Sequence, residues 1–450
     1  MNMTLNHSIV VIGGGISGLS TLHFLKEKYR NRPDMSIKLL EKKPTAGGVI
    51  NSEREAGALF ETGAGSFLNH QPHTLDLINA LGIRDQLIEA SEATKTRYLC
   101  IEQKLYPAPT SPLKLIAFPF LTMKDKLRLL SEKLVKPGMN SRETVHEFVS
   151  RRLSSNWADF LADPMVSGIY AGDAKAIIFK DAFSQLYGYE QNHGSVLKGL
   201  TEQRKVNPAK RVLYSLRGGM VSLTNALYEK YRNDIILSQE VESIDKEPDH
   251  PYFLHTAETM YLANELFIAV PAYAAGYMLN GLDPVLAASL NEIKYAPLAV
   301  IGFVCLKKDF INMPKGFGYL KPSNQKSPIL GVLFEDQIFE NRSQPDQCLL
   351  RLMIGGIRHP QILKYSKDDL IAMARREISE TLGFTGQPVH VFLKTWRNAI
   401  PQYDLHRHQA KICIESALKH HSHIYFTANY WDGVSVNDCI KSAQQTVQLL

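Results

Sequence analysis

The first forty residues contain the feature that most restricts how this chain can fold. The segment SIVVIGGGISGLSTLHFLKEKY combines an apolar strand, a glycine turn and an amphipathic helix. Gly13, Gly15 and Gly18 occupy the G-x-G-x-x-G positions, which allow a tight turn, close approach of a pyrophosphate and packing of the helix on the strand. The start of the helix, with Ile16 and Ser17, offers free amides to phosphate oxygens. The segment predicts an α/β dinucleotide-binding domain.

An acidic residue after the next predicted strand supports this interpretation. The strand SIKLLE ends at Glu41, 23 residues after Gly18. An acid at this place accepts hydrogen bonds from the hydroxyl groups of a ribose. The alternative is a glycine turn in an unrelated α/β protein, but the match in context favours the dinucleotide site.

The residues after Glu41 favour FAD over NAD. NAD dehydrogenases normally continue into further βαβ repeats, whereas this chain continues with two glycine-rich stretches, EKKPTAGGVINS and GALFETGAGSFL. We expect both stretches to lie along the FAD. Their candidate cofactor-binding residues are Gly47, Gly48, Gly63, Ala64, Gly65 and Ser66.

Composition limits the classes of protein to consider. With 450 residues, two or three domains are expected, and 44% hydrophobic with 21% charged residues is ordinary for a soluble globular protein. The net charge of +6 suits acidic small molecules or an anionic membrane surface, and is too weak to predict nucleic-acid binding. Five cysteines without a CxxC pair indicate a reducing compartment. The early first strand leaves no room for a leader peptide, so we expect an intracellular protein.

Changes in sequence pattern along the chain predict a discontinuous α/β fold. Three pieces, 1–92, 201–271 and 395–450, are expected to build the FAD-binding domain. A mainly helical segment, 93–200, and an α/β substrate-binding segment, 272–394, are expected between them. A Thr144-x-x-Glu147 capping box opens one of the helices.

The C-terminal stretch YWDGVSVNDCI predicts a second helix end directed at the flavin. Apolar residues from Ile440 onward fall at helical spacing, so a helix is expected to begin near Asn437 or Asp438. Its amides would face the flavin pyrimidine, where the reduced ring concentrates negative charge. We interpret Cys439 as a small packing residue and not as a nucleophile. The residues that bring backbone close to the ring are Gly433, Val434, Ser435 and Val436.

These stretches, in this order, resemble the protoporphyrinogen oxidases of the flavin amine oxidase superfamily. The resemblance runs from Ile9 to about Ala443 and includes RETVHEFVSRRL, DPMVSGIYAGDA, LRGGM and WRNAIPQY. It implies an FAD domain of the p-hydroxybenzoate hydroxylase type, a substrate domain and a helical membrane-binding insertion. It also implies that a porphyrinogen is dehydrogenated late in heme biosynthesis, in three two-electron steps, with O2 or another electron acceptor.

The resemblance assigns further positions. Arg97 matches an arginine that binds a propionate, and Gly168 matches a glycine whose backbone approaches the substrate. At Gly65 some relatives carry a larger polar residue, so a wider cavity is expected there. No catalytic side-chain base is expected, because the flavin supplies the chemistry. Leu320 and Phe339 are expected to sandwich the macrocycle, with core packing as the alternative role for both. Val241 and Trp396 are expected to contact the flavin.

Membrane contact is expected through residues 110–135, where an apolar run is flanked by lysines. A buried helix pair is the alternative. The expected location is the cytoplasm, with peripheral attachment to the inner face of the cell membrane, and a homodimer is left open. The histidines of KHHSH (420, 421 and 423) are expected in a solvated turn instead of a metal site.

Three other functions stay open from the sequence. Coproporphyrinogen III oxidation would use the same mechanism, and its substrate differs by two extra propionates in place of two vinyls. An amine oxidase would want an aromatic cage and often a covalent flavin cysteine before the flavin contacts, whereas Cys439 follows them. A non-enzymatic binding protein on the same fold, like the Rab GDP-dissociation inhibitors, is disfavoured by the presence of Glu41 and Gly47-Gly48.

Overall fold

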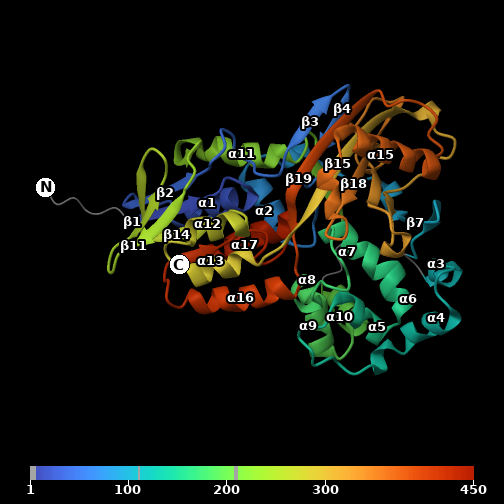
Figure 1. The fold of residues 1–450 in the computed structure, drawn as a ribbon, viewed down its shortest axis with the longest axis horizontal. Coiled ribbons are helices and arrows are strands. Elements are labelled where there is room, and N and C mark those ends of the chain that lie inside the picture. Colours follow the sequence, from blue (N-terminus) through green and yellow to red (C-terminus); the bar gives the residue numbers. More distant parts are fainter. Residues whose placement is uncertain (1–6, 110–111, 207–210) are drawn as a thin grey trace.

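The computed structural model describes residues 7–109, 112–206 and 211–450. Its first layer is a five-stranded sheet in which every neighbouring pair is parallel, in the order β10-β2-β1-β14-β20. These strands are β1 (His7–Ile12), β2 (Met35–Leu40), β10 (Ile235–Ile236), β14 (Glu265–Ile268) and β20 (Ile424–Phe426). Segments more than 400 residues apart in the chain therefore meet in one Rossmann-like sheet (Figure 1).

Helices cover both faces of this sheet because alternate strand residues are buried on opposite sides. Ile9 and Val11 pack on one face, and Val10 and Ile12 pack on the other. The helices of the first face are α1 (Ile16–Lys28), α2 (Pro72–Ala80), α11 (Val221–Tyr231) and α17 (Val436–Gln448). Those of the second face are α12 (Ala272–Leu279), α13 (Pro284–Asn291) and α16 (Leu405–Ala417). We call this assembly the dinucleotide domain.

A seven-stranded sheet, in the order β19-β15-β18-β17-β16-β7-β8, forms the second layer. Helix α15 (Lys367–Leu382) packs on it, and the short α14 (Glu335–Ile338) adjoins β18. The apolar segments LAVIGFVC and CLLRLMIG form most of β15 and β18. The strands are β7 (Tyr98–Ile101), β8 (Lys104–Pro107), β15 (Tyr295–Leu306), β16 (Gly318–Leu320), β17 (Ile329–Phe334), β18 (Gln347–Gly355) and β19 (His390–Pro401).

Two of these strands differ from the sequence expectation. β7 and β8 lie in the part of the chain expected to be mainly helical. They form strands there because β7 pairs in parallel with β16, more than 200 residues away, and β8 pairs with β7. Smaller antiparallel pairings complete the fold: β3 (Ser52–Glu55) with β4 (Ala58–Glu61), β5 (Phe67–Leu68) and β6 (Leu87–Glu89) with β9 (Leu213–Leu216), and β12 (Tyr252–His255) with β11 (Ser243–Lys246) and β13 (Met260–Ala263).

Residues 112–206 form a group of helices at one corner of the molecule, which we call the helical insertion (Figure 1). Its helices are α3 (Pro112–Ala117), α4 (Met123–Leu130), α5 (Val145–Arg152), α6 (Ser155–Trp157), α7 (Asp163–Tyr170), α8 (Phe179–Ala182), α9 (Ser184–His193) and α10 (Val196–Val206). The predicted Thr144–Glu147 capping box opens α5. No helix in the described ranges is both long and apolar enough to cross a bilayer.

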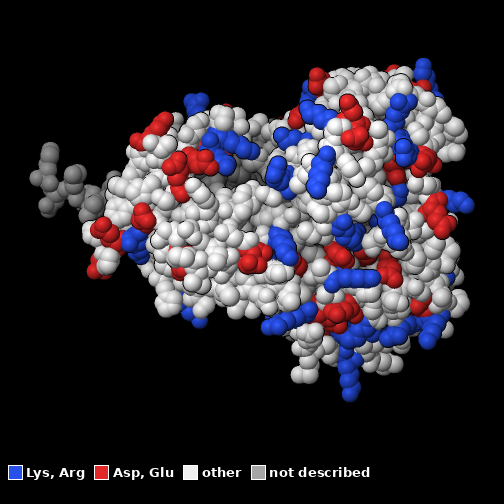
Figure 2. Space-filling view, in the orientation of Figure 1, with Lys and Arg blue, Asp and Glu red and all other residues white. Residues whose placement is uncertain are grey.

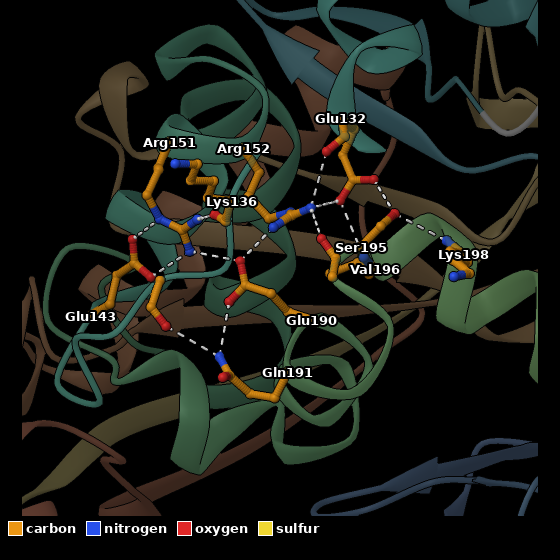
Figure 3. Close-up of polar contacts among 12 residues, drawn as sticks. Glu132, Lys136, Glu143, Arg151, Arg152, Glu190, Gln191, Ser195, Val196 and Lys198 are labelled. Atoms are coloured by element: carbon orange, nitrogen blue, oxygen red, sulfur yellow. Dashed lines mark hydrogen bonds and ion pairs between the residues drawn. The ribbon is translucent and has the colours of Figure 1, made fainter. Parts of the chain in front are cut away.

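The interior of the helical insertion contains charged side chains. Arg152, 2% exposed, lies between the carboxylates of Glu132 and Glu190, each 2.5 Å away (Figure 3). Arg151 binds Glu190 at 2.9 Å and Glu143 at 2.7 Å. This network joins the segment after α4 to α5 and α9, so buried charges there have partners.

Candidate cofactor and substrate site

The phosphate end of the site is formed by the turn between β1 and α1. Gly13 has φ +106°, and Gly15 is the N-cap of α1 without a side-chain cap, so the first amides of the helix are free. A Cβ on Gly18 would lie 1.8 Å from the carbonyl oxygen of Gly13. A Cβ on Gly48 would lie 2.9 Å from Cα of Gly15. A side chain at Gly18 or Gly48 would therefore collide with the backbone of this cradle.

Glu41 lies beside the turn, as the sequence predicts. Its carboxylate accepts hydrogen bonds from the amide of Gly14 at 2.5 Å and from the amide of Lys43 at 2.9 Å. These two bonds fix the buried carboxylate at the end of β2 and leave lone pairs on both oxygens. The group can accept further hydrogen bonds from ribose hydroxyls.

A cavity of about 310 Å³ runs from this turn toward β19 and the start of α17. Most of the predicted cofactor residues line it: Gly13, Gly15, Ile16, Ser17, Glu41, Gly47, Gly48, Ala64, Val241, Trp396, Val434 and Val436. The others lie outside the lining: Gly18, Gly63, Gly65, Ser66, Gly433 and Ser435. Of these, Gly63 shapes the wall, because a Cβ there would lie 2.2 Å from the carbonyl oxygen of Val49.

The far end of the cavity meets the start of α17. Ser435 is the N-cap, and Asp438 is the third helical residue, whose side chain closes a capping box with Ser435. The helix begins at Val436, next to the predicted place, but its N-cap is Ser435 and not Asn437 or Asp438. Cys439 is buried, as expected, and burial raises the pKa of its thiol to about 12. A neutral thiol there packs and does not attack.

Three of the predicted substrate positions lie on the helical insertion and the adjoining edge of the second sheet. The exposed guanidinium of Arg97 lies 4.7 Å from the ring centre of Phe317 and has no hydrogen bond or ion pair with any other residue in the described ranges. Gly168, on α7, faces Leu320, whose methyl carbons lie 3.2 Å from where a Cβ of Gly168 would be. The structure thus brings Gly168 and Leu320 together.

Phe339 lies elsewhere. It is 3% exposed and packs with Ile88 and Ile338, with the guanidinium of Arg342 5.3 Å from its ring centre. This burial favours the packing role, and its contact with a substrate stays a prediction.

The expected widening at Gly65 is not found. A Cβ there would lie 3.1 Å from Cγ of Glu61 and 3.2 Å from Nη1 of Arg351. Arg351 also donates to the carbonyl oxygens of Glu61 at 3.1 Å and Gly63 at 3.2 Å. The space beside Gly65 is therefore filled by side chains that support the loop. Burial raises the pKa of the Glu61 carboxyl in this support.

The wall that follows β14 was missed in the sequence analysis. Ala269, Val270 and Pro271 line the cavity at the carboxyl end of a strand parallel to β1. The run FIAVPA contained the signal, an apolar strand followed by small residues at the edge where α/β sheets bind ligands. Asn398 and Asn429 also line the cavity, and no local motif marks them.

The histidines near residue 420 do not form a common site. His421 lies 2.9 Å from Asp283, and His423 lies 3.1 Å from Glu265. Within the ranges that the structure describes, no group of three or more His, Cys, Asp or Glu side chains could hold a metal ion.

The site fits FAD on three features that stand in one cavity: a glycine cradle with free helix amides, a fixed carboxylate for a ribose, and a second helix end. The family model of the flavin containing amine oxidoreductases matches residues 16–450. The chain therefore belongs to this family, whose members bind FAD.

Proteins similar to this chain include oxidases of porphyrinogens. The chain is 28% identical to protoporphyrinogen oxidase 1 of Arabidopsis thaliana, over 98% of this chain and 88% of the relative. It is 23% identical to coproporphyrinogen III oxidase of Bacillus subtilis, over 98% and 97%. The crystal structure of a putative protoporphyrinogen oxidase from Exiguobacterium sp. 255-15 matches with a TM-score of 0.81, at 23% identity and 98% coverage of both chains.

Proposed function

We propose that the protein oxidises protoporphyrinogen IX to protoporphyrin IX in three two-electron steps, with O2 as acceptor and peroxide as the second product, late in heme biosynthesis. The observation that carries this proposal is the similarity to porphyrinogen oxidases over almost the whole chain. Bound FAD supplies the redox chemistry, and the protein binds and orients the substrate. Coproporphyrinogen III is the second candidate substrate, because a relative of that name matches over the same length.

The distribution of positive charge favours protoporphyrinogen over coproporphyrinogen. Of the arginines near α7 and the loop before Gly65, Arg358 pairs with Asp163 at 2.8 Å, and Arg351 pairs with Glu335 at 2.9 Å. By contrast, the guanidinium of Arg97 has no such partner among the described residues. A substrate with two extra propionates would call for further cations to pair with them.

The test is a paired rate measurement on the purified flavoprotein. Protoporphyrinogen IX and coproporphyrinogen III are supplied in air, and porphyrin fluorescence is followed. Faster formation of protoporphyrin supports the proposal, and faster formation of coproporphyrin transfers it to the second substrate. Absence of porphyrin from both, with peroxide formed from a primary amine such as benzylamine, would assign an amine oxidase instead.

Arg97→Gln sharpens this test. If Arg97 binds a propionate, the substitution should raise KM about tenfold or more, with a smaller change in kcat, because a charged hydrogen bond to bound substrate is lost. Arg217→Gln is the matched control, since Arg217 is an exposed arginine in a surface pair with Glu340. Equal kinetics of the two variants would remove Arg97 from the site.

We also propose that residues 110–135, as far as the structure describes them, rest on an anionic membrane surface at the inner face of the cell membrane. Met123, Leu127, Leu130 and Leu134 follow one another at helical spacing and are all exposed, with Leu134 at 83%. On the opposite side, α4 buries Asp125, which accepts hydrogen bonds from Thr122 and Asn156. Residues 110 and 111 of the expected contact lie outside the described residues.

The surface around this stripe carries positive charge. Lys124, Lys133 and Lys136 are exposed beside it. Figure 2 shows Lys and Arg side chains along the lower edge of the molecule, where Figure 1 places the helical insertion. Apolar side chains flanked by lysines fit an anionic bilayer surface.

Sedimentation with vesicles tests this contact. Wild-type protein should bind phosphatidylglycerol vesicles, and high salt should weaken this binding in part. The double variant Leu130→Glu/Leu134→Glu should not bind. Ile412→Glu, at another exposed apolar position, on α16, should leave binding unchanged. Binding by the double variant would contradict the proposed surface.

A further inference from the structure

The turn between β20 and α17, residues 429–433, has its carbonyl groups fixed from outside the cavity. Asn429 lies in the cavity lining, and α17 begins shortly after the turn. Tyr403 is buried beneath it: its hydroxyl donates to the carbonyl oxygen of Asn429 at 2.8 Å and accepts from the amide of Gly433 at 2.6 Å. The hydroxyl of Tyr403 therefore joins the first and last residues of the turn through hydrogen bonds.

Arg407, on α16, holds the middle of the same turn. Its Nε donates to the carbonyl oxygen of Tyr430 at 3.0 Å, and its Nη2 donates to that of Trp431. The guanidinium lies 4.2 Å from the ring centre of Tyr403 and is 3% exposed. A planar group with donors in a fixed fork can satisfy two successive carbonyls at once, which an ammonium group cannot reproduce.

The remaining side of the guanidinium reaches the helical insertion. Nη1 of Arg407 donates to Asp181, on α8, at 3.1 Å, and the same carboxylate lies 3.0 Å from Nδ1 of His408. Figure 1 shows the end of α16 beside α8. The buried positive charge is therefore compensated by the domain that also carries Gly168.

We propose that Arg407 is a positioning residue for FAD. It fixes the turn 429–433, and with it the cavity end of α17, and its pair with Asp181 makes the shape of that turn depend on the docked helical insertion. By contrast, the glycine cradle between β1 and α1 is shaped by its own backbone. The inference depends on FAD binding and not on which porphyrinogen is oxidised.

The test measures FAD release from purified holoenzyme, by the gain in flavin fluorescence on dilution. Arg407→Lys should raise the FAD dissociation constant about tenfold or more, because charged hydrogen bonds to the turn are lost. Asp181→Asn should raise it less, about threefold, since the contacts of Arg407 with the two carbonyl groups stay. Hydrogen exchange should show that bound FAD no longer protects amides 429–436 in Arg407→Lys, while the amides of α1 stay protected.

Arg152→Lys is the matched control. It also changes a buried arginine that binds two carboxylates (Figure 3), and it lies in the helical insertion, outside the cavity lining. It should lower the melting temperature and leave the FAD dissociation constant within about twofold. If both arginine variants weaken FAD equally, or if Arg407→Lys leaves it within twofold, the proposal is overturned. If Arg407→Lys gives no folded holoenzyme, an unchanged dissociation constant in Asp181→Asn overturns it.

Discussion

The dinucleotide domain and the helical insertion distribute polarity in opposite ways. In the first, alternate apolar strand residues are buried on both faces, and the cofactor turn consists of glycines packed backbone to backbone. In the second, Arg152, Glu132 and Glu190 are buried while Leu130, Leu134 and Met139 are exposed. The first arrangement needs only local backbone fit and apolar burial. The second needs paired charges inside and leaves apolar side chains for an external surface.

The largest effect is expected from breaking the backbone fit of the dinucleotide domain. Gly18→Ala should abolish FAD binding, because the new Cβ would lie 1.8 Å from the carbonyl oxygen of Gly13 and must displace α1. The ratio of flavin to protein absorbance of the purified protein measures this. Gly188→Ala is the control in the helical insertion: no atom lies within 4 Å of its Cβ position in α9, so it should stabilise the protein by up to about 1 kcal/mol. Full flavin content in Gly18→Ala would show that the cradle tolerates a side chain.

The next effect tests whether charge pairing holds the helical insertion. Arg152→Ala should lower the free energy of unfolding by about 3–5 kcal/mol, since it leaves the Glu132 and Glu190 carboxylates buried without this partner. Urea titration followed by circular dichroism measures the loss.

Arg217, which forms an exposed ion pair with Glu340, is the control: Arg217→Ala should leave the free energy of unfolding unchanged. Flavin content should be unchanged in both variants. A loss of FAD in Arg152→Ala, at a temperature where the protein is folded, would mean that the two regions are not independent outside the link through Asp181.

A smaller effect distinguishes the regions by pH. His23, on α1, is buried against the hydroxyl of Tyr231 at 2.7 Å, and burial, aided by Lys230, lowers its pKa from 6.5 to about 4. The unfolded chain therefore binds more protons than the folded one between these values, and stability falls as pH falls. From pH 7.5 to pH 5 this histidine should cost about 2 kcal/mol of unfolding free energy.

His23→Gln should remove this part of the pH dependence in urea titrations at the two pH values, and His250→Gln, at an exposed position, should retain it. Equal pH slopes for wild type and His23→Gln would place the loss of stability in other groups.

The same contrast explains what the sequence could predict. The glycine turn, Glu41 and strands such as β1, β2, β15 and β18 follow from local patterns, and the structure has them. The start of α17 carried its signal too, since Ser435-x-x-Asp438 is a capping box, but two later residues were preferred. Strands β7 and β8 were missed because their partner lies more than 200 residues away. Arg351 beside Gly65 and Arg407 beneath the turn 429–433 depend on tertiary docking, which leaves no local pattern.

The smallest effect is a difference in reactivity between buried and exposed cysteine thiols. Thiolates react with iodoacetamide and thiols do not, so a raised pKa protects a cysteine at neutral pH. Burial raises the pKa of Cys100 to about 11 and those of Cys305 and Cys439 to about 12, whereas Cys413 is exposed on α16.

In native protein at pH 8, peptide mass spectrometry should therefore find Cys413 modified and Cys439 protected. Stability and flavin content should not change, because Cys413 is exposed. In Arg407→Lys, Cys439 should become reactive, since it lies at the cavity end of α17 and donates to the carbonyl oxygen of Gly433, the last residue of the turn that Arg407 holds. Modification of Cys439 in the wild type at the rate of Cys413 would show that this end of the dinucleotide domain opens readily, and the contrast with the helical insertion would then lie in its charges alone.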